Sequence, residues 1–149
     1  MYAKILVVDD DSNVRKVLFD LLKKEKYYVE VASDAEEALE KIKVTAFDLI
    51  ISDIKMPGIG GFKLLEKIRT MNVDSAMLFI TGYGSVDSAI EAIKLGVVDY
   101  IEKPFDIRKF KNLVSQILDA LYIQRTIAKD KLLVYTLSRA IFGNDALHA

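Results

Sequence analysis

The chain has 149 residues, 52% of them hydrophobic, and its 21 Lys and Arg residues nearly balance its 22 Asp and Glu residues. This composition suits one domain with an appendage and excludes a disordered chain, and the balanced charge favours neither a nucleic-acid nor a membrane partner. Without Cys, disulfides and thiolate metal sites are excluded. The N-terminal apolar run is too short for a signal peptide, and no stretch is long enough for a membrane span. The composition therefore predicts a cytoplasmic protein.

Five short runs rich in β-branched and aliphatic residues predict strands at 4–8, 28–32, 48–52, 76–81 and 98–102. Several of these runs are apolar throughout, which is typical of parallel strands covered by helices on both faces.

Between and after these runs, apolar residues recur at helical spacing, in stripes that cover residues 14–22, 35–42, 62–68, 86–93 and 107–117. Three helix starts carry candidate caps, namely Asp11, Ser33 (with Glu36 in an S-x-x-E capping box) and Asp106. Five strand–helix units in about 120 residues predict an α/β fold, a (βα)5 doubly wound parallel sheet of five strands.

In such folds ligands bind outside the carboxyl ends of the strands. The residues expected there are Asp9 and Asp10 after the first strand, Asp53 after the third, Thr81 at the end of the fourth and Lys103 after the fifth. Clustered carboxylates without His or Cys are oxygen ligands for a hard cation such as Mg²⁺. A carboxylate beside such a metal can also act as a nucleophile, and an ammonium and a hydroxyl could bind phosphoryl oxygens.

Four segments at these strand ends, "VVDD", "SDIKMPGIGG", "FITG" and "DYIEKPF", occur in the order and relative spacing of a known family. Over residues 1–122 the sequence resembles the response-regulator receiver domain of bacterial two-component systems, in the CheY-like superfamily. The second and fourth segments most resemble receivers of sigma-54-type activators. The resemblance implies a flavodoxin-like strand order, 2-1-3-4-5.

The resemblance also implies roles for the acidic residues. Asp53 matches the phosphoacceptor, which takes a phosphoryl group from a kinase phosphohistidine. Asp10 matches the principal Mg²⁺ ligand and Asp9 its companion. The backbone carbonyl of Lys55 matches the main-chain metal ligand.

The remaining matches concern the response to phosphorylation. Thr81 matches a hydroxyl that moves onto the phosphoryl group, and Lys103 matches the ammonium that pairs with it. Pro104 commonly follows a cis bond in the family, and Tyr100 matches an aromatic residue whose rotamer follows the Thr movement. The protein would then be no enzyme beyond its own phosphorylation and slow dephosphorylation. The resemblance also implies that Lys55 and Tyr83, at variable positions flanking the site, tune the lifetime of the phosphoryl group.

A sensor histidine kinase or a phosphotransfer protein is the expected donor. The fourth helix, fifth strand and fifth helix are the usual readout face, and a homodimer through that face or through the C-terminal helix is expected, along with an output partner or an effector domain outside this chain.

Residues 123–149 predict a helical extension or linker. No Gly or Pro occurs between Phe105 and Gly143, so the fifth helix could continue for roughly 55 Å or break near residues 129–131. A tail packed on its own domain is the alternative. Arg125 contributes to a locally basic segment that has no DNA-binding motif. Met1 suggests a natural N-terminus, and the single His, His148, is expected to be inert.

Two other protein classes fit less well. A phosphatase of the haloacid-dehalogenase type would use Asp9 as nucleophile in a D-x-D motif, which residues 9–11 formally match, but Asp53 would have no role. A flavodoxin-like or dinucleotide-binding module would need a Gly-rich or hydroxyl-rich phosphate loop after the first strand. Here "DDDSNVR" occupies that place and would repel phosphate without a metal.

Overall fold

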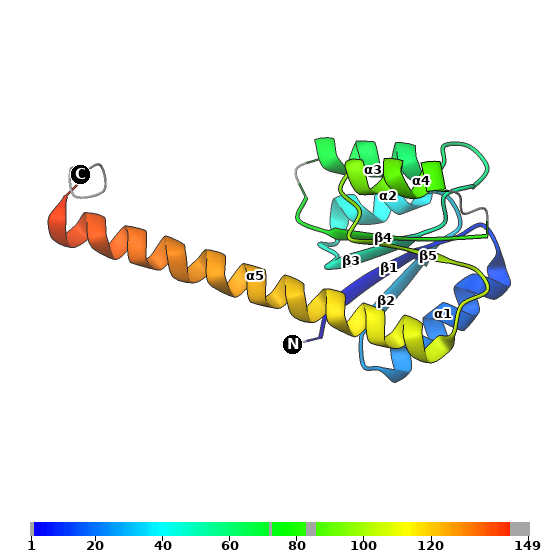
Figure 1. Ribbon diagram of the computed structural model, residues 1–149, viewed down its shortest axis with the longest axis horizontal. Coiled ribbons are helices and arrows are strands. Elements are labelled where there is room, and N and C mark those ends of the chain that lie inside the picture. Colours follow the sequence, from blue (N-terminus) through cyan, green and yellow to red (C-terminus); the bar gives the residue numbers. More distant parts are fainter. Residues whose placement is uncertain (1, 72, 83–85, 144–149) are drawn as a thin grey trace.

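The computed structural model describes residues 2–71, 73–82 and 86–143, so Tyr83 and His148 lie outside the described residues. Within them, strands and helices alternate along the chain (Figure 1). The strands are β1 (Lys4–Val8), β2 (Tyr28–Ala32), β3 (Leu49–Ser52), β4 (Ala76–Thr81) and β5 (Asp99–Glu102). The helices are α1 (Ser12–Lys24), α2 (Ala35–Val44), α3 (Gly61–Thr70), α4 (Val86–Lys94) and α5 (Ile107–Phe142).

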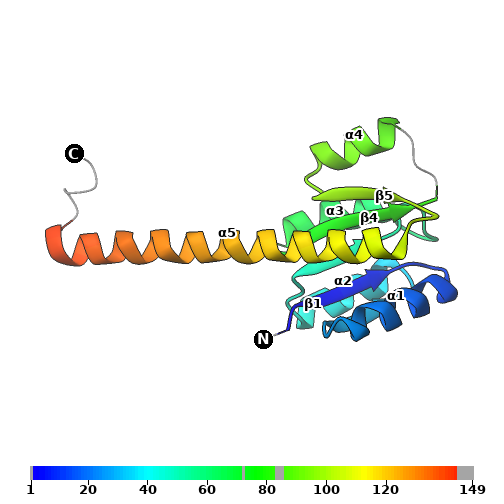
Figure 2. The same cartoon turned by 60° about the horizontal axis from the view of Figure 1, so that its bottom comes forward.

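The strands form one parallel sheet in the order β2-β1-β3-β4-β5, which confirms the predicted fold class and strand order. Helices α1 and α5 cover one face of the sheet, and α2, α3 and α4 cover the other (Figures 1 and 2). Alternate residues of β1 enter opposite layers: Leu6 and Val8 pack in one core cluster, Ile5 and Val7 in the other. The central strands are therefore buried on both faces, as their continuous apolar runs predicted.

The helix caps agree with two of the three predictions. Asp11 caps α1 by accepting from the amides of Asn13 and Val14, and Asp106 caps α5. The predicted capping box at Ser33 was wrong by one residue, because α2 begins at Ala35 and its N-cap is Asp34.

The acid that completes this box is therefore Glu37 rather than Glu36. Its own amide donates to the Asp34 carboxylate at 2.8 Å, and its carboxylate accepts from the amide of Ser33 at 2.9 Å and from the Ser33 hydroxyl at 2.8 Å. These hydrogen bonds from Ser33 lower the pKa of Glu37.

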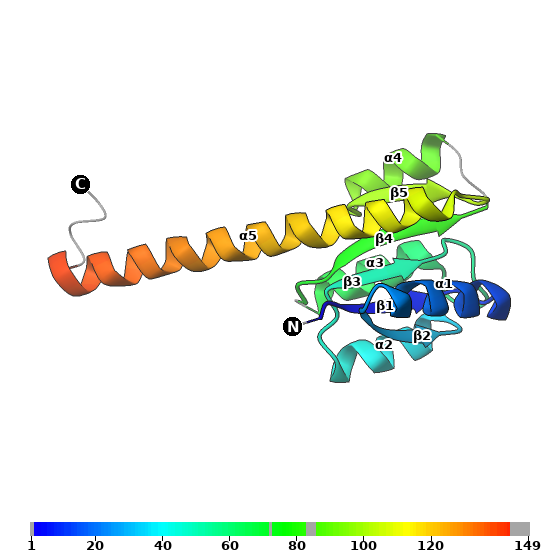
Figure 3. The same cartoon turned by 90° about the horizontal axis from the view of Figure 1, so that it is seen from below.

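Helix α5 is continuous over 36 residues, without a break at residues 129–131. Phe110 and Val114 are fully buried and Leu121 still contacts the core, but from residue 126 to 142 every residue except Ser138 is exposed. From residue 126 onward the described part of the helix thus does not pack on its own domain, and it projects away from the sheet (Figure 3). Among the described residues, no helix combines the length and apolarity that a bilayer crossing would require.

Candidate functional site

The two central strands bring two aspartates together. Val8 and Ser52 are register partners at the ends of β1 and β3, so Asp9 and Asp53, the next residues, lie side by side. The amide of Asp53 donates to the carbonyl of Val8 at 3.0 Å. Together with Asp10, each aspartate offers a carboxylate oxygen, and these oxygens lie within 4.8 Å of one another. Asp9 and Asp53 are buried and Asp10 is exposed. We call Asp9, Asp10 and Asp53 the acidic cluster.

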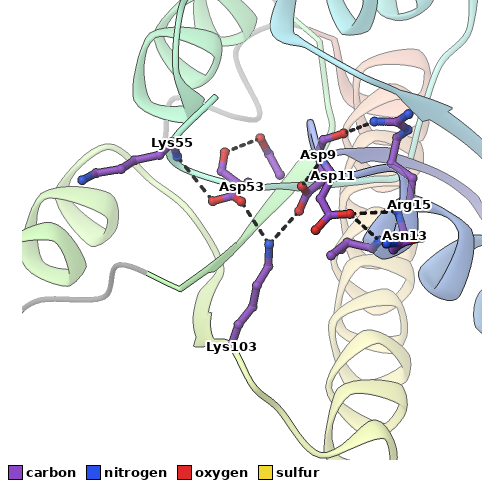
Figure 4. Close-up of polar contacts among 9 residues, drawn as sticks. Asp9, Asp11, Asn13, Arg15, Asp53, Lys55 and Lys103 are labelled. Atoms are coloured by element: carbon purple, nitrogen blue, oxygen red, sulfur yellow. Dashed lines mark hydrogen bonds and ion pairs between the residues drawn. The ribbon is translucent and has the colours of Figure 1, made fainter. Parts of the chain in front are cut away.

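Lys103 places one positive charge between two of these carboxylates (Figure 4). Its Nζ lies 2.8 Å from Oδ2 of Asp9 and 3.0 Å from Oδ2 of Asp53. The main-chain amide of Lys103 donates to the carbonyl of Thr81 at 2.8 Å, and its bond to Pro104 is cis. Four of the five strand-end positions singled out in the sequence therefore meet at one edge of the sheet through β1, β3 and the segment after β5.

The main chain and carboxylate of Asp9 are held at four points. Its amide donates to the carbonyl of Ala32, and its Oδ1 accepts from the amide of Asp11 at 2.9 Å. Its carbonyl accepts from Nη1 of Arg15 at 2.7 Å, and its Oδ2 accepts from Lys103. The sequence does not predict this role of Arg15, because nothing in the helical pattern of α1 distinguishes an arginine that reaches back to the residue after the preceding strand.

Asp53 is held in place by its neighbours in sequence and by the start of α3. Its Oδ1 accepts from the amide of Lys55 at 3.3 Å, and its carbonyl accepts from the hydroxyl of Ser52 at 2.8 Å. The start of α3 packs directly on this backbone, since a Cβ added to Gly61 would lie 2.5 Å from the Asp53 carbonyl oxygen. The "PGIGG" turn therefore needs a glycine here to bring the loop against Asp53.

The charges of the site are unequally compensated. Burial raises the pKa of Asp9, and the neighbouring charge of Asp53 raises it further; hydrogen bonds from Lys103 and Asp11 only partly offset this rise. For Lys103, burial lowers the pKa, but hydrogen bonds to Asp9 and Asp53 outweigh burial and raise the pKa overall. Lys103 thus remains charged, whereas the ionised form of Asp9 is held at an energetic cost that a further cation would reduce.

Thr81 and Tyr100 occupy different depths in the sheet. Thr81 is fully buried at the end of β4, beside the backbone of Lys103. Tyr100 lies inside β5 as the register partner of Phe79, contacts the core cluster covered by α2, α3 and α4, and has a buried hydroxyl oxygen. Tyr100 is therefore not at the strand ends: it lies on β5, three residues before Lys103, and beside Phe79 of β4.

The acidic cluster opens into a hollow of about 450 Å³ lined by Asp9, Asp10, Asp11, Asp53, Lys55, Met56, Pro57 and Lys103. Its donors are carboxylate oxygens, and neither His nor Cys lines it. Such a donor set, partly buried and partly open to solvent, fits Mg²⁺, which prefers one or two carboxylates together with water and phosphate oxygens. The donor set of this hollow is therefore compatible with Mg²⁺.

A second aspartate pair lies at the opposite edge of the sheet. Nη1 of Arg125 binds Oδ1 of Asp48, while its Nε donates to Oδ2 of Asp74 at 3.1 Å and its Nη2 to the carbonyl of Asp74 at 2.7 Å. We call Arg125, Asp48 and Asp74 the clamp. In the sequence Arg125 is only one residue of a locally basic segment, because only the fold brings the two aspartates to it.

Comparison with known proteins identifies this architecture. The family model described as the response regulator receiver domain matches residues 5–115. Transcriptional regulatory protein ZraR of Klebsiella oxytoca is 41% identical over 114 residues, which are 76% of this chain and 26% of ZraR. Response regulator protein FleR of Pseudomonas aeruginosa is 41% identical over 116 residues, 78% of this chain and 24% of FleR. The chain thus spans about a quarter of the length of these curated relatives.

Solved structures support the same family assignment. A CheY-like response regulator receiver domain protein from Methanospirillum hungatei JF-1 superimposes with a TM-score of 0.79 at 32% identity, covering 83% of this chain and 99% of that chain. NtrX from Brucella abortus superimposes with a TM-score of 0.81 at 31% identity, covering 87% of this chain and 29% of that chain. The match over most of the chain, on a parallel sheet with an acidic edge, shows that the chain belongs to the response regulator receiver domain family.

Proposed function

We propose that this chain is a phosphorylation-switched signalling receiver whose Asp53 accepts a phosphoryl group from the phosphohistidine of a sensor histidine kinase or a phosphotransfer protein. The observation that carries the proposal is the position of Asp53 at the acidic edge, with Lys103 Nζ 3.0 Å from its carboxylate. A carboxylate oxygen of Asp53 would attack phosphorus in line, forming the O–P bond as the P–N bond to the donor histidine breaks. Lys103 would then donate to the transferred phosphoryl oxygens.

Asp9, Asp10, Asp53 and the backbone carbonyl of Lys55 are the residues that would hold Mg²⁺. When bound, the metal supplies positive charge that offsets the negative charge of the phosphoryl group. The raised pKa of Asp9 supports this assignment, since an anion held at a cost binds a cation more readily. Lys103 and Asp11 keep the Asp9 carboxylate in place and aimed at the hollow.

The switch would consist of two packings of the same fold, one of them favoured by the phosphoryl contacts. The Thr81 hydroxyl would move onto the phosphoryl group, and Tyr100 would follow it by changing rotamer. The register of β4 and β5 supports this coupling, because Tyr100 pairs with Phe79, two residues before Thr81.

The output would pass through the surface of α4, β5 and α5 to a partner, to an effector domain or to a second copy of the chain. The relatives' names, transcriptional regulatory protein and response regulator protein, support a role in control of a downstream response. Residues 1–122 would be the receiver domain and residues 123–149 the extension or linker. Such a protein would act in the cytoplasm, without contacting membrane or nucleic acid itself.

Receiver domains are signalling modules rather than enzymes that turn over a substrate. The haloacid-dehalogenase alternative, with Asp9 as nucleophile, is not favoured, because the family match covers residues 5–115 as a receiver. In that alternative Asp53 would have no role, although its carboxylate lies at the same edge of the sheet as Asp9 and 3.0 Å from Nζ of Lys103.

Mass spectrometry of the intact chain after incubation with acetyl phosphate and Mg²⁺ tests the proposal. We expect one phosphoryl adduct, its loss in Asp53→Asn, and its retention in Asp119→Asn, a control that removes an exposed carboxylate of α5. An adduct that survives Asp53→Asn, or label found on Asp9, would overturn the assignment.

A further inference from the structure

Asp10 is the exposed member of the acidic cluster, and its carboxylate has no support of its own. Asp9 is 2% exposed and Asp53 8% exposed, and the carboxylates of both accept hydrogen bonds. Within the described residues, the Asp10 side chain makes no hydrogen bond and no ion pair. The direction of this carboxylate therefore depends on the main chain that carries it.

That main chain is held by Arg15. Nη1 of Arg15 donates to the carbonyl of Asp9 at 2.7 Å (Figure 4). Because a peptide unit is planar, the hydrogen bond that orients the Asp9 carbonyl also orients the amide nitrogen of Asp10. On either side of this peptide, the Asp9 amide donates to the carbonyl of Ala32 at 3.1 Å, and the Asp11 amide donates to Oδ1 of Asp9 at 2.9 Å. Arg15 thus sets the rotation of the peptide between two fixed points.

Arg15 is itself placed by the first turn of α1. Its amide donates to the carbonyl of Asp11 at 3.0 Å, and the side chain of Asp11 caps the same turn. Leu18 and Leu22, both buried, hold the helix against the sheet. The Arg15 side chain is half-buried. A rigid element therefore carries the guanidinium to the loop that bears Asp9 and Asp10.

The guanidinium binds a neutral carbonyl although three carboxylates precede it closely in the sequence. Within the described residues Arg15 forms no ion pair, whereas Lys103 pairs with Asp9 and Asp53. A guanidinium bound to these carboxylates would compete with a metal ion for their oxygens. Bound to the carbonyl, it orients the chain without this competition.

We propose that Arg15 is a positioning residue of the metal site, which orients the Asp9–Asp10 peptide so that the Asp10 carboxylate meets the geometry that Mg²⁺ requires. The proposal rests on the proposed function in that it takes the acidic cluster as the Mg²⁺ site. Mg²⁺ demands near-ideal octahedral geometry, whereas Ca²⁺ accepts flexible arrangements of its oxygen ligands. A carboxylate with a fixed direction favours Mg²⁺, so Arg15 contributes to selectivity as well as to affinity.

The charge of Arg15 and its hydrogen bond predict opposite effects on the metal. A positive charge repels a cation, so an Arg15 that acted through its charge alone would weaken Mg²⁺ binding, and its removal would strengthen it. An Arg15 that orients Asp10 strengthens binding, and groups that hold metal ligands in place typically contribute roughly 10- to 100-fold in affinity. The sign of the change on substitution therefore separates the two roles.

Calorimetric titration of the full chain with Mg²⁺, without a phosphoryl donor, tests the proposal. We expect the dissociation constant to rise about 10- to 100-fold in Arg15→Met, which removes the donor. Arg15→Lys should show a smaller rise, since it keeps a donor but loses the planar fork. A dissociation constant that is unchanged or lower in Arg15→Met would overturn the proposal, and a wild type that binds no Mg²⁺ would overturn it together with the metal assignment.

Lys16→Met is the matched control. Lys16 is the next residue of α1, its side chain is 79% exposed, and it pairs with Asp20 at 3.4 Å. Removing it takes the same charge from the same helix turn without touching the loop, so Mg²⁺ affinity should stay the same or rise slightly. An equal loss of affinity in Lys16→Met would show that the contact of Arg15 with Asp9 is not the cause.

Titration with Ca²⁺ separates positioning from a general loosening of the fold. We expect the ratio of Mg²⁺ to Ca²⁺ affinity to fall by about tenfold in Arg15→Met, because the swinging carboxylate harms the ion with the stricter geometry more. Circular dichroism at the titration temperature shows whether the variant is folded; if Arg15→Met is not, Arg15→Lys supplies the same comparison. An equal loss of affinity for both ions would overturn the role in selectivity.

Phosphorylation of Asp53 by acetyl phosphate distinguishes this inference from the proposed function. In Arg15→Met the rate should require more Mg²⁺ to reach its maximum, while the maximum itself should stay near that of the wild type. A wild type that binds Mg²⁺ but takes no phosphoryl group on Asp53 would overturn the proposed function and not the role of Arg15. A phosphorylated wild type with unchanged Mg²⁺ affinity in Arg15→Met would do the reverse.

Discussion

Strand β3 has an aspartate at each end, and each belongs to a two-aspartate, one-cation arrangement. At the carboxyl end of the sheet, Lys103 bridges Asp53 and Asp9. At the amino end, Arg125 bridges Asp48, just before β3, and Asp74, two residues before β4. The same kinds of residue form the proposed phosphorylation site at one edge and the clamp at the other.

The clamp and the acidic cluster differ in the kind of cation and in the number of carboxylates around it. All three guanidinium nitrogens of Arg125 donate to the clamp, and the other oxygen of Asp48 accepts from the Lys4 amide at 2.8 Å. Lys103 is a compact charge on a flexible chain, and the exposed Asp10 adds negative charge beside it. In the clamp, every nitrogen of the planar guanidinium has a partner. At the acidic cluster, the point charge of Lys103 lies among three carboxylates, an arrangement consistent with the proposed binding of a further cation and a phosphoryl group.

The largest effect is expected at Lys103. In Lys103→Met the rate of Asp53 phosphorylation by acetyl phosphate should fall about 10²- to 10³-fold, the usual consequence of removing one preorganised donor to a reacting anion. Mg²⁺ affinity, measured by calorimetry, should not fall and should rise, because the metal no longer competes with the ammonium for Asp9 and Asp53.

Lys109→Met, at an exposed position of α5, serves as the control and should change neither quantity. A parallel loss of Mg²⁺ affinity and phosphorylation rate in Lys103→Met would show that Lys103 organises the cluster instead of competing with the metal.

A smaller effect is expected at the clamp. Arg125→Gln leaves two aspartates facing each other and should lower the free energy of unfolding by about 1–2 kcal/mol, a value limited by solvent screening of this partly exposed side chain. Urea denaturation measures the change, and Arg125→Lys should retain part of the stability, since it keeps the charge but loses the fork.

Arg108→Gln removes an exposed arginine of the same helix and should leave the midpoint unchanged. Phosphorylation of Asp53 should persist in Arg125→Gln; its loss there would mean that the two edges are not separable as described.

The smallest effect is expected for Asp9→Asn. This substitution should stabilise the protein, in contrast to Arg125→Gln, and by an amount that depends on pH. The pKa of Asp9 is raised above its ordinary value of 3.8, chiefly by burial. The folded protein therefore binds this proton more tightly than the unfolded chain, and the resulting stability is complete below the ordinary pKa and lost as pH rises through the folded-state pKa. Without Mg²⁺, Asp9→Asn should raise the melting temperature at pH 7 by roughly a few degrees.

The gain from Asp9→Asn should shrink toward zero as pH falls below 4 and Asp9 itself becomes neutral. A melting temperature at pH 7 lower than that of the wild type would indicate that the ion pair with Lys103 outweighs the cost of burying Asp9.

The local residue pattern and the positions of residues at strand ends were sufficient to predict much of the fold and the acidic cluster. All five strands lie where their apolar runs placed them, and Asp11 and Asp106 cap the helices they were expected to cap. The acidic edge was predictable because carboxyl ends of parallel strands meet at one edge of the sheet, so residues far apart in sequence are forced together. The capping box failed because Ser33 and Asp34 are both good caps, and only the position of the helix start decides between them.

The contacts that individual helix side chains make with distant segments could be seen only in the folded chain. Periodicity places Arg15 and Arg125 on helices but does not reveal that one reaches the Asp9 carbonyl and the other joins the loops before β3 and β4. The path of α5 past the domain is also not revealed by the sequence. A helical pattern sets the length of this helix, but packing sets where it leaves the sheet. The sequence by itself thus determined the strands and the acidic edge, because apolar runs mark the strands and the carboxyl ends of parallel strands meet at one edge of the sheet. The clamp and the direction in which α5 leaves the sheet depended on side chains that meet only after folding.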